Sequence, residues 1–118
     1  MFTLVNINQA QYQQATGRII AELASAAVTE TEGVTCRVVK IFPEHDGGAR
    51  NPHTHSDVEE VIFVLEGQGR IWIEEDEKEI SKDDLIVVPM KMRHRIINPA
   101  DKPLRLLCFF PRAKVEIP

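Results

Sequence analysis

The sequence predicts an all-β fold, a sandwich or a barrel of short strands, in a single domain that spans residues 1–118. Two observations support this prediction. From Val34 onward, runs of β-branched and other apolar residues recur at short intervals, with turn signals rich in Gly, Pro, Asn and charged residues between them. No regular alternation of strands with helical segments is present, which argues against a parallel α/β architecture.

Six stretches carry the strand signal: Val34–Phe42, Val58–Leu65, Arg70–Glu74, Leu85–Val88, Arg95–Ile97 and Leu104–Phe110. The charged residues 75–78 and the stretch 29–33 are predicted turns. Residues 7–30 stay ambiguous, because the short apolar run 18–23 fits either a helix or a strand. Several strands are apolar at every position, so both of their faces should be covered. A second sheet, the N-terminal segment or another subunit could cover the outer face, and a homodimer is one expectation.

Composition narrows the class of protein. The 118 residues are 43% apolar and 27% charged, which is typical of a globular domain large enough to bury a core. The net charge of −4 and the lack of a long basic cluster argue against nucleic acid as a partner. No apolar stretch is long enough to span a membrane, and no signal peptide is evident. Two distant cysteines favour a reducing compartment, so we expect a cytoplasmic location.

Two short segments hold three of the four histidines. His53 and His55 are two residues apart, so on an extended segment they project to the same side. Glu60 begins the next predicted strand, and its carboxylate can reach the same point. His94 comes from a later strand. A His-Thr-His sequence or a Glu-Glu pair alone is more often a solvated surface feature, but their joint occurrence favours a metal site formed by His53, His55, Glu60 and His94.

Three imidazoles and one carboxylate suit a divalent transition metal, namely Mn, Fe, Co, Ni, Cu or Zn, rather than Ca or Mg. If the ion is octahedral, four protein ligands leave two positions for water, a small-molecule substrate or dioxygen. Open positions indicate a catalytic or ligand-binding metal.

At this point the sequence resembles the cupin superfamily. Gly47, five residues, His53-Thr54-His55, four residues, Glu60, six residues and Gly67 reproduce the first cupin motif without a gap. The resemblance implies a double-stranded β-helix, or jelly roll, with the metal inside the barrel. It also implies that the family's ligands correspond to His53, His55, Glu60 and His94, and that the chain forms a homodimer.

The second cupin motif has the expected spacing, but two of its positions carry other residues. Pro89, His94 and Asn98 fit, whereas Asp83 and Lys91 occupy the two glycine positions. Asp tolerates the left-handed backbone conformation better than Lys does. We therefore expect the loop around Lys91 to have a different shape.

Other residues are weaker candidates for contact with a substrate. Ile62 shares the face of Glu60, Ile96 shares the face of His94, and Cys108 could face the barrel interior. Arg50 precedes the ligand segment and is the best of several arginines that could bind a carboxylate. Asn98 is expected to hydrogen-bond the backbone or a group near the ligands.

Three functions are compatible with these residues. The first is a metal-dependent dioxygenase or decarboxylase that acts on a small oxygenated acid or enol, with Glu60 as both ligand and catalytic proton shuttle. The second is a module that binds or senses a sugar-like or metal-chelated ligand without turnover. The third is a barrel with a structural metal only. A general base besides Glu60 is not evident, which weighs against proton-transfer chemistry.

Overall fold

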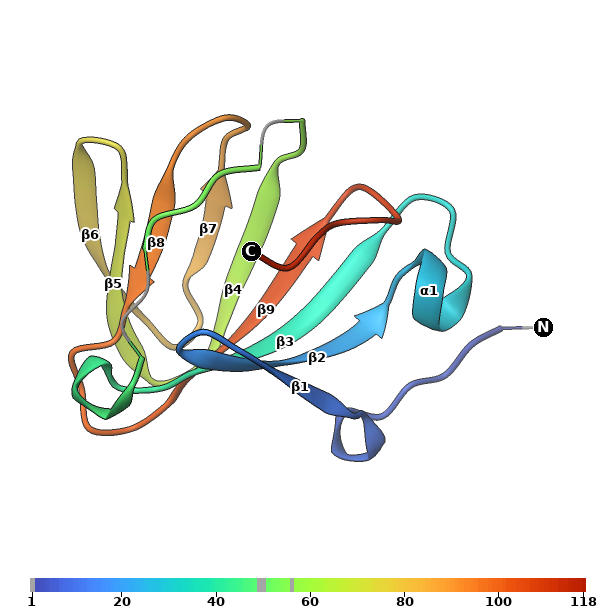
Figure 1. The fold of residues 1–118 in the computed structure, drawn as a ribbon, viewed down its shortest axis with the longest axis horizontal. Helices are drawn as coiled ribbons and strands as arrows, with labels where there is room; N and C mark the ends of the chain where they lie inside the picture. The colour runs from blue at the N-terminus through green and yellow to red at the C-terminus, as the bar shows by residue number, and fades with distance from the viewer. Residues whose placement is uncertain (1, 49–50, 56) are drawn as a thin grey trace.

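The computed structural model describes residues 2–48, 51–55 and 57–118 and shows two antiparallel sheets (Figure 1). Six strands form the larger sheet, in the order β1-β2-β3-β9-β4-β7, and three form the smaller one, in the order β6-β5-β8. Strands distant in sequence are neighbours in both sheets. This crossing arrangement, with very little helix, is the jelly-roll or double-stranded β-helix architecture that the resemblance implied.

The elements follow in chain order. The strands are β1 (Tyr12–Ala15), β2 (Arg18–Ala24), β3 (Thr35–Ile41), β4 (Glu60–Glu66), β5 (Gln68–Ile73), β6 (Asp76–Ser81), β7 (Leu85–Val88), β8 (His94–Ile97) and β9 (Leu104–Phe110). The helical elements are short: η1 (Ile7–Gln9), α1 (Ala26–Thr29) and η2 (Glu44–Asp46).

Alternation along the strands creates the core. In β4 and β9 every second residue is buried, and the residues between them are more exposed. The inward residues of both sheets form one apolar cluster, to which Val39, Ile62, Ile96 and Leu106 belong. Burial of this cluster supplies the main driving force for folding.

Each of the six predicted strands is present, and the structure corrects two turns. Residues 76–78 belong to β6 rather than to a turn, and the reversal lies at Glu74 and Glu75, where Glu74 has a positive φ of 51°. The ambiguous region contains β1, β2 and α1. Helix α1 includes Thr29 and ends where Glu30 adopts the left-handed conformation. The turn predicted for residues 29–33 therefore begins at residue 30, one residue later than predicted.

The outer face of the larger sheet is not fully covered within one chain. Leu85 and Val87 on β7 are 59% and 52% exposed, and Phe109 on β9 is 37% exposed. Within the single chain the outer face is therefore only partly covered, and its cover by another subunit stays a prediction. The described part of the chain contains no helix that is long and apolar enough to cross a membrane.

The motif glycines and their replacements share one backbone conformation. Gly47 and Gly67 have φ values of 82° and 94°, and Asp83 and Lys91 have φ values of 77° and 67°. The expectation of a different loop at Lys91 is wrong, because Lys91 adopts the left-handed conformation in spite of its side chain. Its amide also donates a hydrogen bond of 2.9 Å to the carbonyl oxygen of His55, which holds the residue in place.

We expect Lys91→Gly to raise the free energy of unfolding by about 0.5–1 kcal/mol, because a left-handed L-residue costs about 1–2 kcal/mol and the greater entropy of unfolded glycine offsets part of the gain. Urea unfolding followed by circular dichroism measures the change. Lys82→Gly is the matched control, since Lys82 is an exposed turn residue without a positive φ, and it should lose stability. A loss of stability in Lys91→Gly as well would contradict the prediction.

Candidate metal centre

The segment that carries His53 and His55 pairs with the segment that leads into β8. The amide of His53 donates to the carbonyl oxygen of His94 at 3.0 Å, and the amide of His94 donates to that of His53 at 2.8 Å. With the hydrogen bond from Lys91 to His55, these contacts hold the two segments antiparallel. Among the described residues of this segment, His53 alone forms a β-bridge, so the segment is extended backbone rather than a strand.

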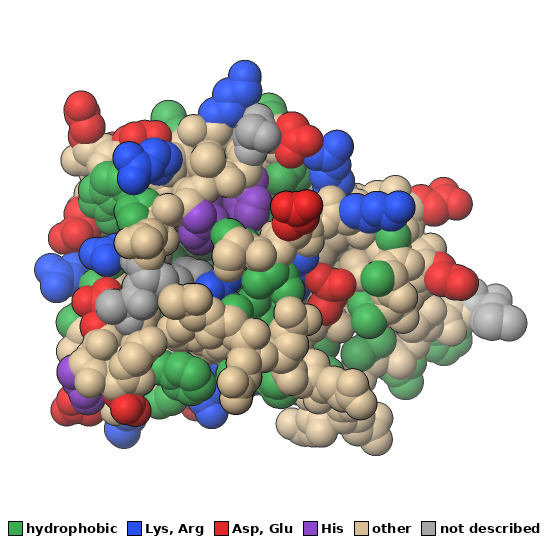
Figure 2. Space-filling view, in the orientation of Figure 1, with side chains coloured by type: hydrophobic (Ala, Val, Ile, Leu, Met, Phe, Trp, Pro, Cys, Tyr) green, Lys and Arg blue, Asp and Glu red, His purple; other side chains and the backbone are tan. Residues whose placement is uncertain are grey.

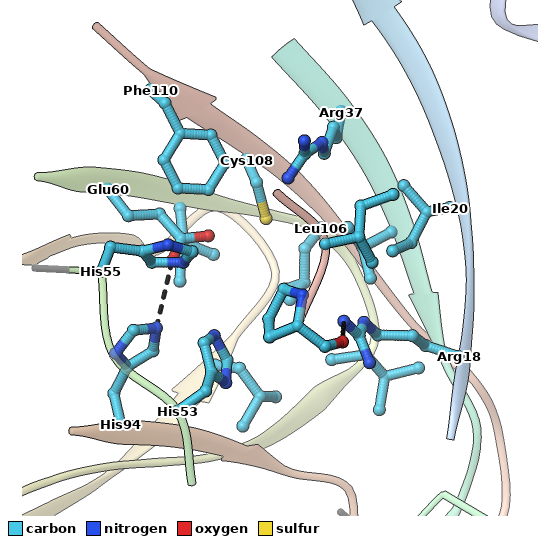
Figure 3. Close-up of a pocket in the computed structure, with 16 residues that line it drawn as sticks. Arg18, Ile20, Arg37, His53, His55, Glu60, His94, Leu106, Cys108 and Phe110 are labelled. Carbon is cyan, nitrogen blue, oxygen red and sulfur yellow. Dashed lines mark hydrogen bonds and ion pairs between the residues drawn. The ribbon is translucent and has the colours of Figure 1, made fainter. Parts of the chain in front are cut away.

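The four predicted ligands converge, as the sequence spacing predicted. Ligand atoms of His53, His55, Glu60 and His94 all lie within 4.8 Å of one another. Oε1 of Glu60, the first residue of β4, lies 3.1 Å from Nε2 of His94 and 3.8 Å from Nε2 of His55. Figure 3 shows the four side chains gathered at one side of a pocket.

Contacts with neighbouring groups orient two of the imidazoles. Nδ1 of His94 lies 3.1 Å from the carbonyl oxygen of Met92, which can only accept, so Nδ1 carries the proton and Nε2 faces Glu60. The ring of His55 packs edge-on against Phe110, with 5.0 Å between centroids. Burial lowers the pKa of His55 more than the charge of Glu60 raises it, which favours the neutral imidazole that binds metals.

The donor set fits a metal ion. Ligand atoms that share one ion at about 2.1 Å lie about 3.0–4.2 Å apart, close to the separations seen here. Nε2 of His94, with its proton on Nδ1, and the Glu60 carboxylate both present lone pairs to the same point. Either a proton or a metal ion between them satisfies both acceptors. The cluster therefore has the composition and spacing of a metal centre.

A cavity of about 40 Å³ adjoins the cluster and is walled mainly by apolar side chains. The predicted substrate contacts Ile62, Ile96 and Cys108 all line it. Arg50, the fourth predicted contact, lies outside the described residues. Histidine side chains are visible from outside near the middle of the face shown in Figure 2, so the cluster is accessible from the surface.

Sequence reasoning missed two arginines that line the same cavity. Arg18 on β2 and Arg37 on β3 are each 4% exposed. A signal for Arg37 was available, because alternation in the run Thr35–Ile41 places it on the face of Val39 and Ile41. The region around Arg18 was too ambiguous to assign a face.

The segment after β9 was also missed. Residues 113, 115 and 117 are partly buried and alternate with exposed residues, and Val115 and Ile117 pack against the core. Side chains from the barrel bind its backbone: Thr35 to the carbonyl oxygen of Arg112, and Arg37 to that of Val115. The alternation in Ala113–Pro118 was the available sequence signal.

Two further motif residues have structural roles. Asn98 is fully buried, and its amide group donates to the carbonyl oxygens of Ile41 and Lys102, as the backbone role predicted for it requires. His45, the fourth histidine of the chain, lies in an exposed loop beside Asp101 at 3.0 Å and takes no part in the cluster.

The fold and the site together define a jelly-roll barrel with a candidate metal centre inside. A model of the cupin domain matches residues 40–110, more than half of the chain, and the chain belongs to the cupin family. An uncharacterized protein of Methanocaldococcus jannaschii is 38% identical over 56 residues, which are 48% of this chain. The match covers 45% of that relative, so this chain corresponds to about half of its length.

Solved structures agree with the fold. A predicted oxalate decarboxylase from Thermotoga maritima has a TM-score of 0.80 at 17% identity, over 93% of this chain and 99% of that one. Oxalate decarboxylase from Lactobacillus farciminis, in a formate complex, has a TM-score of 0.79 at 21% identity, over 93% of this chain and 33% of that one. KdgF from Halomonas sp. has a TM-score of 0.76 at 20% identity, over 95% of this chain and 96% of that one.

We expect the purified protein to bind about one metal ion per chain, measured by elemental mass spectrometry after dialysis. His94→Ala removes one donor, and it should weaken metal binding by about 100-fold or more, since even loss of an outer hydrogen-bond partner costs about 10–100-fold. His45→Ala is the matched control and should bind metal as the wild type does. Equal metal content in both variants would contradict the assignment.

Proposed function

We propose that this chain is a metal-dependent enzyme that acts on a small oxygenated acid or enol, as a dioxygenase or a decarboxylase. One observation carries the proposal: the four donor atoms converge at the end of an apolar cavity that other side chains line, rather than in a closed core. A purely structural metal site needs no such cavity. Two similar structures are described as oxalate decarboxylases, which is compatible with this class of reaction.

The proposed cofactor is one divalent transition metal ion, Mn, Fe, Co, Ni, Cu or Zn, which when bound would polarise the oxygens of the substrate or support dioxygen chemistry. The residues of the chain orient and shield this centre. Met92 holds the His94 ring through Nδ1, and Phe110 packs against His55. The apolar walls formed by residues such as Ile62 and Ile96 lower the polarity around the reacting groups.

Glu60 is the proposed proton shuttle. Its side chain is 8% exposed, and one carboxylate oxygen lies within hydrogen-bonding distance of His94. A second carboxylate oxygen remains to accept or return a proton at the substrate. General acid–base catalysis by such a group contributes about 10²–10⁴-fold to a rate.

A binding or sensing module without turnover is the alternative, and one observation favours it. Among the side chains of the described residues that line the cavity, that of Glu60 is the sole carboxylate, and the other titratable side chains are those of the three ligand histidines, Arg18, Arg37 and Cys108. A second general base is therefore not evident in the described part of the pocket.

We expect the metal-loaded protein to consume oxygen or release carbon dioxide with at least one member of a panel of small hydroxy, keto and dicarboxylic acids. An oxygen electrode and a carbon dioxide assay measure the two reactions. Glu60→Gln should reduce the rate by about 100-fold or more, through loss of the shuttle and of one ligand.

His45→Ala should retain full activity. Tight binding of a panel acid in calorimetry, with no product after long incubation, would support the binding module instead. Treatment with a chelator tests the third possibility, a barrel with a structural metal only. Removal of a structural ion should lower the melting temperature strongly.

The chain is also proposed to form a homodimer. Leu85 and Val87 leave an apolar patch on the edge strand β7, and the N-terminal arm carries Phe2 and Leu4 at 85% and 87% exposure. The arm extends away from the body of the chain (Figure 1). In a dimer with two-fold symmetry, the apolar patch and the N-terminal arm of each copy would be buried against the other copy.

We expect light scattering to give a mass of about twice the 13.4 kDa of one chain. Val87→Glu places a charge on the patch and should yield monomers with an unchanged circular dichroism spectrum. Val28→Glu, at an apolar position of α1 that is 55% exposed, is the control for the substitution itself. A monomeric wild-type protein would exclude the proposal.

A further inference from the structure

The imidazole of His55 is oriented by packing rather than by a hydrogen bond. The carbonyl oxygen of Met92 fixes the ring of His94 through Nδ1, whereas no acceptor among the described residues fixes the ring of His55 in this way. Oε1 of Glu60 lies 3.8 Å from Nε2 of His55, which is beyond hydrogen-bonding distance. Outside the cluster, the ring of Phe110 packs edge-on against His55 with 5.0 Å between centroids. The orientation of His55 therefore depends on where Phe110 lies.

Phe110 is itself in contact with a buried arginine. It is the last residue of β9 and pairs with Thr35, so Arg37, two residues further along β3, is its diagonal neighbour across the sheet. The guanidinium of Arg37 lies 5.4 Å from the centroid of the Phe110 ring, within the range of a cation–π contact. Figure 3 shows Phe110 beside both His55 and Arg37. The three side chains form a row that ends at the metal donors.

The guanidinium of Arg37 is held in place by other parts of the chain. Its Nε donates to Oε1 of Glu22 at 2.9 Å, and Oγ of Ser25 donates to Oε2 of the same carboxylate at 2.8 Å. Another nitrogen of Arg37 donates to the carbonyl oxygen of Val115. Glu22 is the cross-strand partner of Arg37 on β2, so the pairing of the two strands places the ion pair. These contacts keep the guanidinium against Phe110.

Stability alone does not explain an ion pair at this position. Arg37 is 4% exposed and lies on the same face of β3 as Val39 and Ile41, which belong to the apolar core. Replacement of a buried ion pair by apolar residues of similar volume is often neutral or stabilising, because the loss of hydration offsets the attraction between the charges. A planar guanidinium fixed by two partners does give a defined surface for the ring that packs on it.

We propose that Arg37 is a positioning residue of the metal centre, which holds Phe110 against His55 and thereby fixes the direction in which this ligand faces the ion. The inference rests on the proposed metal-dependent function, since it needs an ion at the cluster. Residues that orient metal ligands without touching the ion commonly contribute about 10–100-fold to metal affinity. The side chain of Glu22 is 24% exposed, so the row connects an ion pair near the surface to a ligand inside the barrel.

Binding of Co²⁺ to the full chain, measured by competition with a chromophoric chelator, tests the proposal. Arg37→Lys keeps the charge but loses the planar guanidinium, so it should weaken cobalt binding by about 10-fold and alter the visible absorption of the bound ion. Arg18→Lys is the matched control. Arg18 is also 4% exposed in the wall of the same cavity, but oxygens of Thr16 and Pro118 hold it, so this variant should bind cobalt as the wild type does.

A double-mutant cycle tests whether Arg37 acts through Phe110. Phe110→Leu should weaken cobalt binding by about 10-fold or more, and Arg37→Lys should add little in that background, because effects that pass through one contact are not additive. Additive losses would overturn the proposal. Wild-type affinity and absorption in Arg37→Lys would overturn it as well.

Glu22→Ala reaches the row from its outer end and replaces Arg37→Lys if that variant does not fold. It releases the guanidinium and leaves the residues that line the cavity unchanged, so cobalt binding should weaken in the same direction by a smaller factor. Glu66→Ala, which removes the surface ion pair with Arg105, is its control and should bind cobalt as the wild type does. Equal affinity in these two glutamate variants would count against the proposal.

The metal-free protein gives a readout that needs no ion. The ring protons of His55 lie beside Phe110, so their NMR signals at fixed pH should shift in Arg37→Lys, while those of the exposed His45 should not. Unshifted His55 signals would refute the positioning role. A wild-type chain that binds no cobalt would contradict the metal centre instead, and one that binds cobalt without turnover would contradict the enzyme alone, with the affinity difference between wild type and Arg37→Lys retained.

Discussion

The pairing of His53 with His94 is the interaction on which the rest of the site depends. Two backbone hydrogen bonds fix these residues opposite each other, and the ring centroids lie 4.2 Å apart. His55 follows two residues later on the same side, with its carbonyl oxygen bound by Lys91. Three ligands from two separate segments thus occupy one short antiparallel pairing, and Glu60, the fourth ligand, is supplied by β4. Backbone geometry, rather than attraction among the ligands, brings the donors together.

Much of the fold and the ligand set could be predicted from the sequence, because both depend on local periodicity. Alternation in Glu60–Glu66 gives one buried and one more exposed face in the structure, as strand geometry requires. The spacing of the first motif predicted the convergence of His53, His55 and Glu60, and the second motif added His94. Such patterns can be read from a sequence because the burial of a strand alternates from one residue to the next.

Other parts were not predictable for physical reasons. Strand β6 (Asp76–Ser81) has four exposed charged residues in succession and a single buried residue, Ile80, so its membership in a sheet comes from pairing with β5 rather than from hydrophobicity. Lys91 adopts a conformation that its own preference opposes, because the surrounding hydrogen bonds determine the loop. Arg18 is buried through long-range contact with Pro118, which no local pattern reveals.

The interior contains one arrangement of polar groups that folding alone does not favour. Oε1 of Glu60 and Nε2 of His94 both present lone pairs and lie 3.1 Å apart, whereas Arg18, elsewhere in the cavity wall, is held by the oxygens of Thr16 and Pro118. A cation between the two acceptors relieves their repulsion. Because the surroundings of these two acceptors are of low polarity, an unbalanced pair of lone pairs costs more there than it would in water. The metal donors are therefore the part of the interior whose electrostatics a bound cation would complete, while the buried arginine is already held by the chain itself.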